Sequence, residues 1–239
     1  MQIEIPAEAR SDLPHPAHPR AAAASQRVRP ALESALYQQG LRFGDPVFLR
    51  AYKKERLLEV FVRNRDDGKF HLFRSYPVAA ASGAPGPKLR EGDKQVPEGF
   101  YSVSPPAMNS ESKFHLSFNL GYPNAFDRHH RRDGSLIMIH GGRASIGCLA
   151  MTDPAIEEIY TLCDAAQRGG QRFFRVHIFP FRMTDENLAA THDHPWHDFW
   201  RNLRDGHDWF EKHGVPPDAR VSPDGTYLFL PATEPKPAL

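Results

Sequence analysis

Short runs of apolar residues, many alternating with polar ones, recur along most of this chain and are bounded by glycine, proline and aspartate. This pattern is typical of β-strands. The turn RDDG at 65–68 separates two such runs and predicts a hairpin. Strands are therefore expected at 46–52, 57–64, 69–79, 100–105, 113–120, 135–140 and 171–180, with a closing hairpin at 220–230.

A smaller part of the chain has helical spacing of its apolar residues. The best-marked helix follows residue 153: Asp153 is expected to cap it, Pro154 suits its first position, and two glutamates fall in its first turn. Gly169 and Gly170 are expected to end it. Further helices are expected at 30–41, 185–190, 195–204 and 207–213.

Together these elements predict a single domain that is mainly β with peripheral helices, an α+β fold. Residues 1–28 are rich in proline, alanine and charge and are expected to form a flexible N-terminal arm. Residues 29–239 are expected to form the folded domain, which ends in a helical extension. The loop at 81–99 is dense in glycine and proline, and a loop of this length in a compact domain often binds a ligand.

Composition narrows the classes of protein that this chain can belong to. Of its 239 residues, 40% are hydrophobic and 25% charged, which is enough apolar material for a core. The net charge of +1 gives no reason to expect nucleic acid or a membrane surface as a partner. No apolar run approaches the ~18 residues of a transmembrane segment. No signal peptide is visible at the N-terminus, so either the protein is cytosolic or an export signal has been removed.

The two cysteines occupy different kinds of position. Cys163 follows Ile156 and Ile159 on the apolar face of the helix after residue 153, so we expect it in the core. Cys148 lies between a strand end and a helix start, next to Gly147. Two cysteines are too few for a disulfide framework, although one bridge between them is compatible with the sequence.

Candidate chemistry centres on Cys148 and on His140, eight residues before it at the end of a strand. The short connection contains Gly141 and Gly142 and can fold back to bring the two side chains together. An imidazole titrates near neutral pH and can take the thiol proton, and backbone N–H groups around Gly147 and Cys148 are candidates for an oxyanion hole. The pair also fits half of a metal site, but no CxxC or HxxxH spacing accompanies it.

The segment IHGGRASIGCLAMTD resembles the active-site signature of the L,D-transpeptidase (YkuD-type) catalytic domain, in which HG at a strand end is followed by S-x-G-C. The resemblance continues in GPKLREGDKQVPEGFYSV, GYPNAFDR and FPFRMT, and these segments are similar to the Gram-negative branch that acts on murein. It covers roughly residues 45 to 185 and continues more weakly in DFWRNLRDGHDWFE.

This resemblance implies a β-rich catalytic domain in the periplasm that needs no cofactor or metal. It implies that Cys148 attacks the carbonyl at the L-centre of meso-diaminopimelate in a peptidoglycan stem peptide and forms a thioester. His140 is then the base, and the Gly141 carbonyl orients its ring. Ser145 and Gly147 shape the turn and the oxyanion hole. Arg143 lies inside the motif and is the implied contact for a stem-peptide carboxylate. Tyr122, Asn124 and Asp127, in the family-like segment, are expected to line the groove, which is compatible with a turn built on Pro123 and Asn124. Arg182, which follows a strand, is expected to be either an ion-pair partner or a substrate anion contact.

One departure from the family pattern concerns the fate of the thioester. Many relatives have histidine directly before the Gly-Cys pair, where this chain has Ile146. The acyl group can pass to an amine, giving a transpeptidase, or to water, giving an amidase that for example releases a murein-bound lipoprotein. A third hypothesis is a non-catalytic murein-binding module, and an activated Cys148 would argue against it by reacting with alkylating agents well below pH ~8.5, the region of a free thiol pKa.

Histidines outside this motif raise a second hypothesis, that of a metal site. His192, His194 and His197 lie close together and can be read as zinc ligands or as a solvated helix face. The solvated interpretation is favoured because Trp196, Phe199 and Trp200 mark the apolar face of that helix. His129 and His130 are likewise interpreted as part of a solvated loop.

Overall fold

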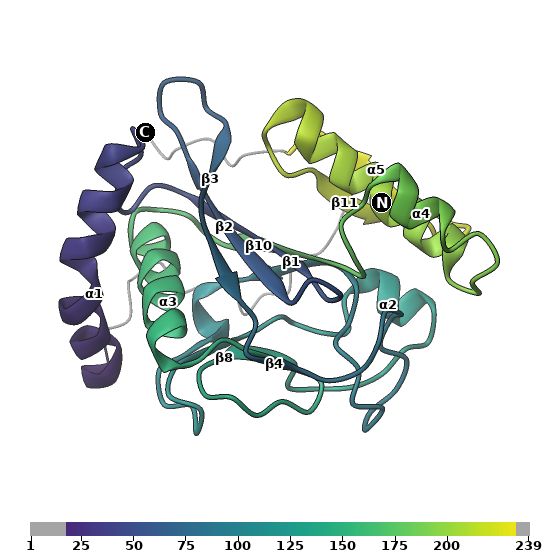
Figure 1. Cartoon of the computed structure of the whole chain (residues 1–239), viewed down its shortest axis with the longest axis horizontal. Helices are drawn as coiled ribbons and strands as arrows, with labels where there is room; N and C mark the ends of the chain where they lie inside the picture. Colours follow the sequence, from purple (N-terminus) through teal and green to yellow (C-terminus); the bar gives the residue numbers. More distant parts are fainter. Residues whose placement is uncertain (1–17, 233–239) are drawn as a thin grey trace.

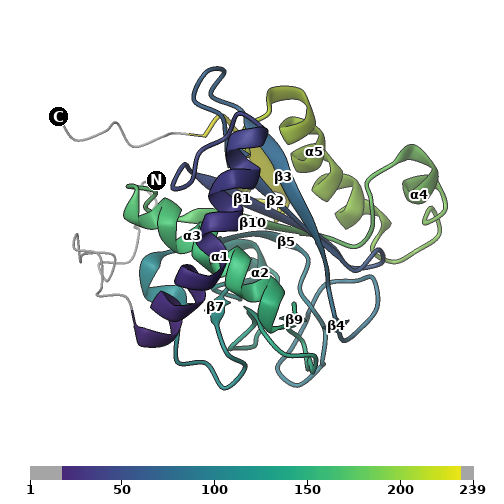
Figure 2. The same ribbon diagram turned by 60° about the vertical axis from the view of Figure 1, so that its left-hand side comes forward.

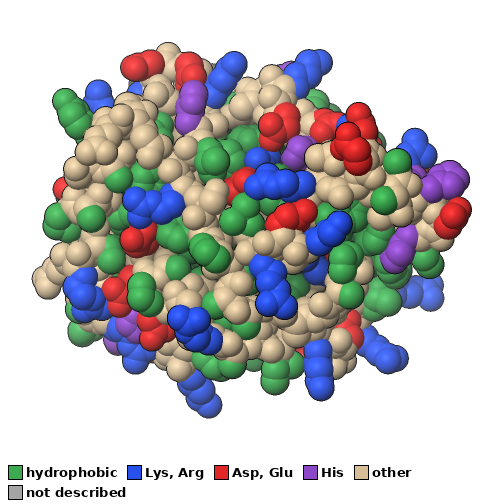
Figure 3. All heavy atoms as spheres, in the orientation of Figure 1, with side chains coloured by type: hydrophobic (Ala, Val, Ile, Leu, Met, Phe, Trp, Pro, Cys, Tyr) green, Lys and Arg blue, Asp and Glu red, His purple; other side chains and the backbone are tan. Residues whose placement is uncertain are grey.

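The computed structural model describes residues 18–232 and forms two five-stranded sheets, a small hairpin and five α-helices within that range. The helices lie outside the sheets (Figures 1 and 2). This arrangement confirms the single α+β domain. In Figure 3, Lys and Arg side chains are interspersed with Asp and Glu over the face seen, consistent with the net charge of +1.

The first sheet is the centre of the fold. Its central strand, β1, runs parallel to β10, and the other three pairings are antiparallel. In spatial order the strands are β3 (Phe70–Pro77), β2 (Leu57–Arg63), β1 (Val47–Tyr52), β10 (Phe174–Phe179) and β5 (Gly99–Val103). The hairpin between β2 and β3 confirms the turn expected at 65–68.

Alternation along β1 explains why the whole strand is buried. Leu49 and Ala51 face the larger core, which is covered by α1 (Pro19–Gln38) and α3 (Asp153–Arg168). Phe48 and Tyr52 point to the opposite face and pack under α5 (His197–His213). Because successive side chains of a strand point to opposite faces, a strand covered on both sides carries apolar residues at nearly every position.

The second sheet is shorter and lies below the first in Figure 1. Its strands β8 and β9 run parallel, and the other pairings are antiparallel. In spatial order it comprises β4 (Ala80–Ala81), β9 (Leu149–Ala150), β8 (Met138–His140), β7 (Ser117–Asn119) and β6 (Met108–Asn109). The remaining elements are the 3₁₀ turn Pro105–Ala107, α2 (Ala125–His129), α4 (Asp185–Ala189), and the hairpin of β11 (Asp218–Val221) and β12 (Tyr227–Leu230).

The N-terminal prediction needs a correction. The helix expected at 30–41 begins at Pro19, so residues 19–28 are helical and do not belong to a flexible arm. Ala24, Leu32 and Leu36 are buried along one side of α1, and this contact with the core explains why the alanine-rich stretch folds. Residues 1–17 of the expected arm lie outside the described residues.

Two other local predictions are also wrong in part. The strand expected at 113–120 is confined to Ser117–Asn119, and the residues before it form a loop. The two helices expected at 195–204 and 207–213 are one continuous helix, α5. Gly206 does not break α5 because the rings of Phe100 and Phe229 pack against it where a side chain would stand.

Candidate active site

Cys148 lies where the second sheet begins its parallel pair. Ile139 pairs with Leu149 and His140 with Ala150, so Cys148 stands beside Met138, one residue before β9. The Met138 N–H donates to the Cys148 Sγ over 3.4 Å, and Sγ lies 3.7 Å from the Leu136 carbonyl oxygen. The side chain is half-buried, whereas Cys163 is fully buried in the core; both thiols are free.

The strand register brings His140 to the same face as Cys148. Paired residues on parallel strands point to the same side, and residues two apart on one strand also share a side. Diagonal neighbours on adjacent strands lie about 7–8 Å apart, within reach of a ring. No direct hydrogen bond joins the ring to Sγ among the described residues, and such contacts often tighten only when substrate is bound.

The His140 ring is held in one orientation. Its Nδ1 lies 2.5 Å from the Gly141 carbonyl oxygen, so Nδ1 carries the proton and Nε2 presents a lone pair. The ring is buried, and the Phe114 ring covers it at a centroid distance of 4.6 Å. Burial lowers the pKa of His140 below its ordinary value, and the bond to Gly141 offsets part of that lowering.

The surroundings of Cys148 disfavour its thiolate form on balance. Burial raises the pKa of its thiol, and the Met138 N–H and the charge of Lys88 offset only part of that rise. A neutral thiol beside a neutral imidazole is suited to proton removal during attack rather than to a standing ion pair. Whether Cys148 is alkylated well below pH ~8.5 stays a prediction for experiment.

The turn before Cys148 is built from hydroxyl contacts. Ser145 Oγ accepts from the Cys148 N–H over 3.1 Å and donates to the Cys148 carbonyl over 2.6 Å. The Gly147 N–H donates to Ser82 Oγ over 2.6 Å, and Gly147 has a φ of +88°, a conformation that favours glycine. Both N–H groups that were expected to form an oxyanion hole are thus occupied by serine oxygens.

The loop after His140 is fixed to the start of α3. Asp153 Oδ1 accepts from the Gly142 N–H over 2.7 Å, and the Thr152 N–H donates to the Gly142 carbonyl over 2.9 Å. Thr152, not Asp153, is the N-cap of α3, which corrects the predicted cap. Gly141 is needed for close approach, because a Cβ there would lie 2.6 Å from Asp153 Oδ1 and 2.7 Å from the Phe114 carbonyl oxygen.

Backbone strain gathers at this site. Only six non-glycine residues in the described part of the chain have a positive φ, and three of them border the His140–Cys148 pair. They are His115 (φ 70°), Leu136 (φ 53°) and Thr152 (φ 73°). Such conformations cost on the order of 1–3 kcal/mol each and persist where surrounding contacts hold them, as they do at active sites.

Lys88 is a buried cation from the 81–99 loop that the motif did not indicate. Its ammonium bonds the Arg90 carbonyl over 2.8 Å and Asp93 Oδ1 over 2.6 Å. Its charge acts on the Cys148 thiol. The feature of the sequence that could have indicated Lys88 is the length of the 81–99 loop. The same loop contains Ser82, whose Oγ accepts from the Gly147 N–H.

The predicted substrate contacts at 122–127 are part of the framework. The Tyr122 hydroxyl donates to the Lys88 carbonyl over 3.0 Å and supports that loop. Asn124 and Asp127 cap α2 with a reciprocal pair of hydrogen bonds. Asp127 is buried and also accepts from Tyr101 and Arg132. These contacts account for Asn124 and Asp127 without a substrate.

The two predicted arginine contacts lie in different places. Arg143 is exposed beside a hollow of about 420 Å³ that is bordered by Gly142 and the first residues of α3, close to the candidate pair. Arg182 lies on the first sheet, 3.2 Å from Glu59 Oε1 and over the Tyr52 ring. Of the two, only Arg143 is placed beside His140 and Cys148.

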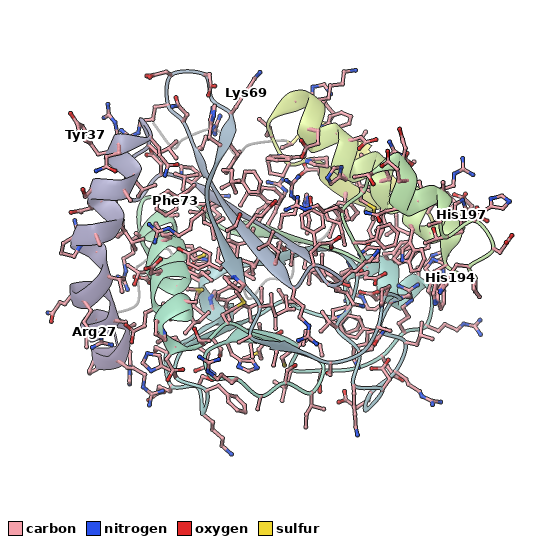
Figure 4. The ribbon with its side chains drawn as sticks, in the orientation of Figure 1. Arg27, Tyr37, Lys69, Phe73, His194 and His197 are labelled. Atoms are coloured by element: carbon pink, nitrogen blue, oxygen red, sulfur yellow. The ribbon has the colours of Figure 1, made fainter. Side chains whose placement is uncertain are left out.

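The histidines weighed as zinc ligands contact aromatic and hydroxyl side chains. His194 stacks on Trp200 at 4.4 Å, and His197 Nδ1 lies 3.3 Å from Thr191 Oγ1; Figure 4 shows both histidines at the end of α5 away from α1. Within residues 18–232, no three His, Cys, Asp or Glu side chains gather as metal ligands would. No helix in that range is long and apolar enough to cross a membrane.

Comparison with known proteins agrees with this geometry. The family model described as the L,D-transpeptidase catalytic domain (YkuD) matches residues 46–178. A protein of Escherichia coli K12 named "Putative L,D-transpeptidase YafK" is 41% identical over 192 residues, which cover 80% of this chain and 76% of that protein.

Solved structures also align with the chain, at lower identity. The helical cell shape determining protein Pgp2 from Campylobacter jejuni aligns with a TM-score of 0.44 and 18% identity, covering 80% of each chain. Bd1075 from Bdellovibrio bacteriovorus aligns with a TM-score of 0.41 and 22% identity, covering 71% of this chain and 56% of that one. On the family match and the identity to the E. coli protein, the chain belongs to the L,D-transpeptidase catalytic domain family.

Proposed function

We propose that this protein is a murein L,D-transpeptidase of the periplasm, with Cys148 as nucleophile and His140 as general acid and base. The observation that carries the proposal is the fixed imidazole: its Nδ1–H is bound to the Gly141 carbonyl, and its Nε2 is free on the strand next to Cys148. The family supplies the substrate class, peptidoglycan stem peptides.

The first half-reaction forms a thioester. Nε2 of His140 takes the thiol proton as Sγ of Cys148 bonds to the carbonyl carbon at the L-centre of the stem-peptide diaminopimelate. The tetrahedral intermediate then collapses, the C–N bond breaks, and His140 returns the proton to the leaving amine. A buried neutral imidazole suits both proton transfers, because it can accept in the first step and donate in the second.

The second half-reaction passes the acyl group to an amine. The amine attacks the thioester carbonyl, gives a proton to His140, and the C–S bond breaks to restore the Cys148 thiol. If water attacks in place of the amine, the same site is an amidase, and its natural substrate would be an attached amine such as that of a murein-linked lipoprotein. Ile146 is 75% exposed beside this point and is the residue by which the acceptor side differs from relatives with histidine.

The test is product identification by mass spectrometry with murein fragments, with and without a peptide-linked stem. Transfer predicts cross-linked dimers or exchanged amines; hydrolysis predicts shortened stems or a freed peptide. Cys148→Ala should abolish both outcomes, whereas Cys163→Ala, which removes the buried thiol of α3, should keep them. Turnover by Cys148→Ala would disprove the assignment, and an intact wild-type protein that never forms an acyl adduct would favour the non-catalytic module.

A further inference from the structure

The loop before β7 covers the catalytic histidine. Residues 113–116 were expected to be strand but leave the sheet, and Phe114 lies with its ring 4.6 Å from the His140 ring at an interplanar angle of 30°. Phe114 is 47% exposed, whereas His140 beneath it is 2% exposed. The phenyl ring therefore forms part of the barrier between the imidazole and solvent.

An arginine from the N-terminal helix holds this loop from a distance. Nη1 of Arg20 donates to the carbonyl oxygens of Ser112 and His115, both at 2.8 Å. These two carbonyls flank Phe114. His18, directly before α1, lies 3.2 Å from Glu111 and adds a second contact to the same loop.

The loop needs such support because its backbone is strained. His115 has a φ of 70°, and its ring Nε2 lies 2.7 Å from Glu157 of α3. Glu157 also forms an ion pair with Arg27 of α1, whose Nη2 lies 2.5 Å from Glu157 Oε1. Arg27 lies on the lower part of α1 beside α3 in Figure 4. A left-handed residue persists when several contacts fix it, and here those contacts come from α1 and α3.

The geometry points to Arg20 as a positioning residue: by bonding the carbonyls of Ser112 and His115, it holds Phe114 on the His140 ring and so makes α1 part of the active site. This inference rests on the proposed function, because the position of Phe114 over the His140 ring affects catalysis only if His140 is the base. The α3 helix that packs against α1 also fixes the other side of the histidine loop through Thr152 and Asp153.

The consequence for His140 is measurable without turnover. Burial lowers its pKa, so loss of the cover should raise that pKa toward the ordinary value for histidine. The other ionisable side chains on and around the covering loop and the histidine loop are Glu111, Lys113, His115, Cys148, Asp153 and Glu157, and the variants below change none of them. NMR titration of labelled imidazoles, with His140→Ala to assign the signal, reads the effect directly.

The experiment compares Arg20→Ala, Phe114→Ala and the double variant, with Arg29→Ala as the matched control. Arg29 lies on the same helix but pairs with Glu33 of α1 and not with the loop. Both single variants should raise the pKa of His140 and lower kcat/KM, by up to about 100-fold for a misplaced catalytic group. The double variant should behave like Phe114→Ala alone, because the two residues act through one contact. Arg29→Ala should change neither quantity.

Two results would overturn the inference: an unchanged His140 titration in Arg20→Ala, or an Arg20 effect that adds in full to that of Phe114→Ala. If Arg20→Ala does not fold, Arg20→Lys replaces it, since one ammonium cannot reproduce the guanidinium contacts and should give a partial shift. Turnover by Cys148→Ala would remove the proposed function, yet the titrations would still decide whether Arg20 places Phe114 on His140.

Discussion

Two buried histidines, one in each sheet, show what separates a candidate base from a packed ring. His140 ends β8 in the second sheet, and its Nδ1 is bound to a carbonyl oxygen. His177 lies in β10 of the first sheet between the rings of Phe48 and Phe100, at 4.6 Å from each, and its Nδ1 has no hydrogen-bond partner. Burial is common to both, but of the two only His140 has its Nδ1 bound to a carbonyl oxygen and a thiol one residue before the next strand.

The backbone and the elements around the two rings also differ. Around His140 the backbone is strained, and two loops far apart in sequence converge on it. Around His177 the strands are regular and α5 covers the ring, while Arg50 and Arg175 help to push the pKa of His177 well below its ordinary value after the larger effect of burial. If the proposed function is right, the first sheet mainly contributes stability and the second sheet places the reactive groups.

The largest effect that tests this contrast is on turnover. His140→Ala should lower kcat by about 10²–10⁴-fold, the usual contribution of general acid–base catalysis. His177→Leu should keep kcat within about twofold, because His177 lies on the first sheet under α5, away from the thiol. Steady-state kinetics of both variants, with thermal melts to confirm folding, give the comparison. Equal losses in the two variants would contradict the proposed division of roles.

Two glycines offer a sharper version of the same comparison. Gly141 and Gly206 both lack room for a side chain, and neither has a positive φ. Gly141→Ala should force the histidine loop away from Asp153 and the Phe114 carbonyl, with a loss of activity of up to about 100-fold. Gly206→Ala should instead overpack α5 against Phe100 and Phe229 and lower stability by about 1–3 kcal/mol.

The measurements are kcat/KM of the folded protein and urea denaturation for both variants. Gly141→Ala is expected to lose mainly activity, and Gly206→Ala mainly stability. A Gly206→Ala protein that is stable but inactive would mean that α5 and the first sheet take part in the reaction.

The sequence predicted what depends on local pattern. The hairpin at 65–68, the strand before His140, the helix bearing Cys163 and the turn position of Cys148 all follow from periodicity and turn residues. The failures lie where distant residues decide. Arg20 and Glu157 pull residues 113–116 out of the expected strand, and the rings of Phe100 and Phe229 keep Gly206 inside a helix.

The site was predictable to the same extent. The prediction that His140 and Cys148 lie on adjoining elements followed from spacing and the family motif, and in the strand register the two residues share a face. The state of the groups did not follow. Ser82 occupies the Gly147 N–H from the 81–99 loop, and burial rather than local charge sets the pKa of Cys148, so neither is visible in the motif itself.

The smallest effect concerns how stability depends on pH. His177 has a lowered pKa in the folded protein, so below the ordinary histidine pKa of about 6.5 the unfolded chain binds a proton that the folded protein does not. The free energy of unfolding should therefore fall as pH drops from about 7.5 toward 5.5, through the contributions of His177, His140 and His207, whose pKa is also lowered. His177→Leu removes one of these contributions, and its free energy of unfolding should fall less over the same range.

Urea denaturation at several pH values measures how the free energy of unfolding of wild type and of His177→Leu changes with pH. Between about pH 8.5 and 7.5, where histidine is neutral even in the unfolded chain, wild type and variant should run parallel. Identical slopes at low pH would mean that the His177 ring is protonated in the folded protein, and the contrast with His140 would then have to rest on geometry alone.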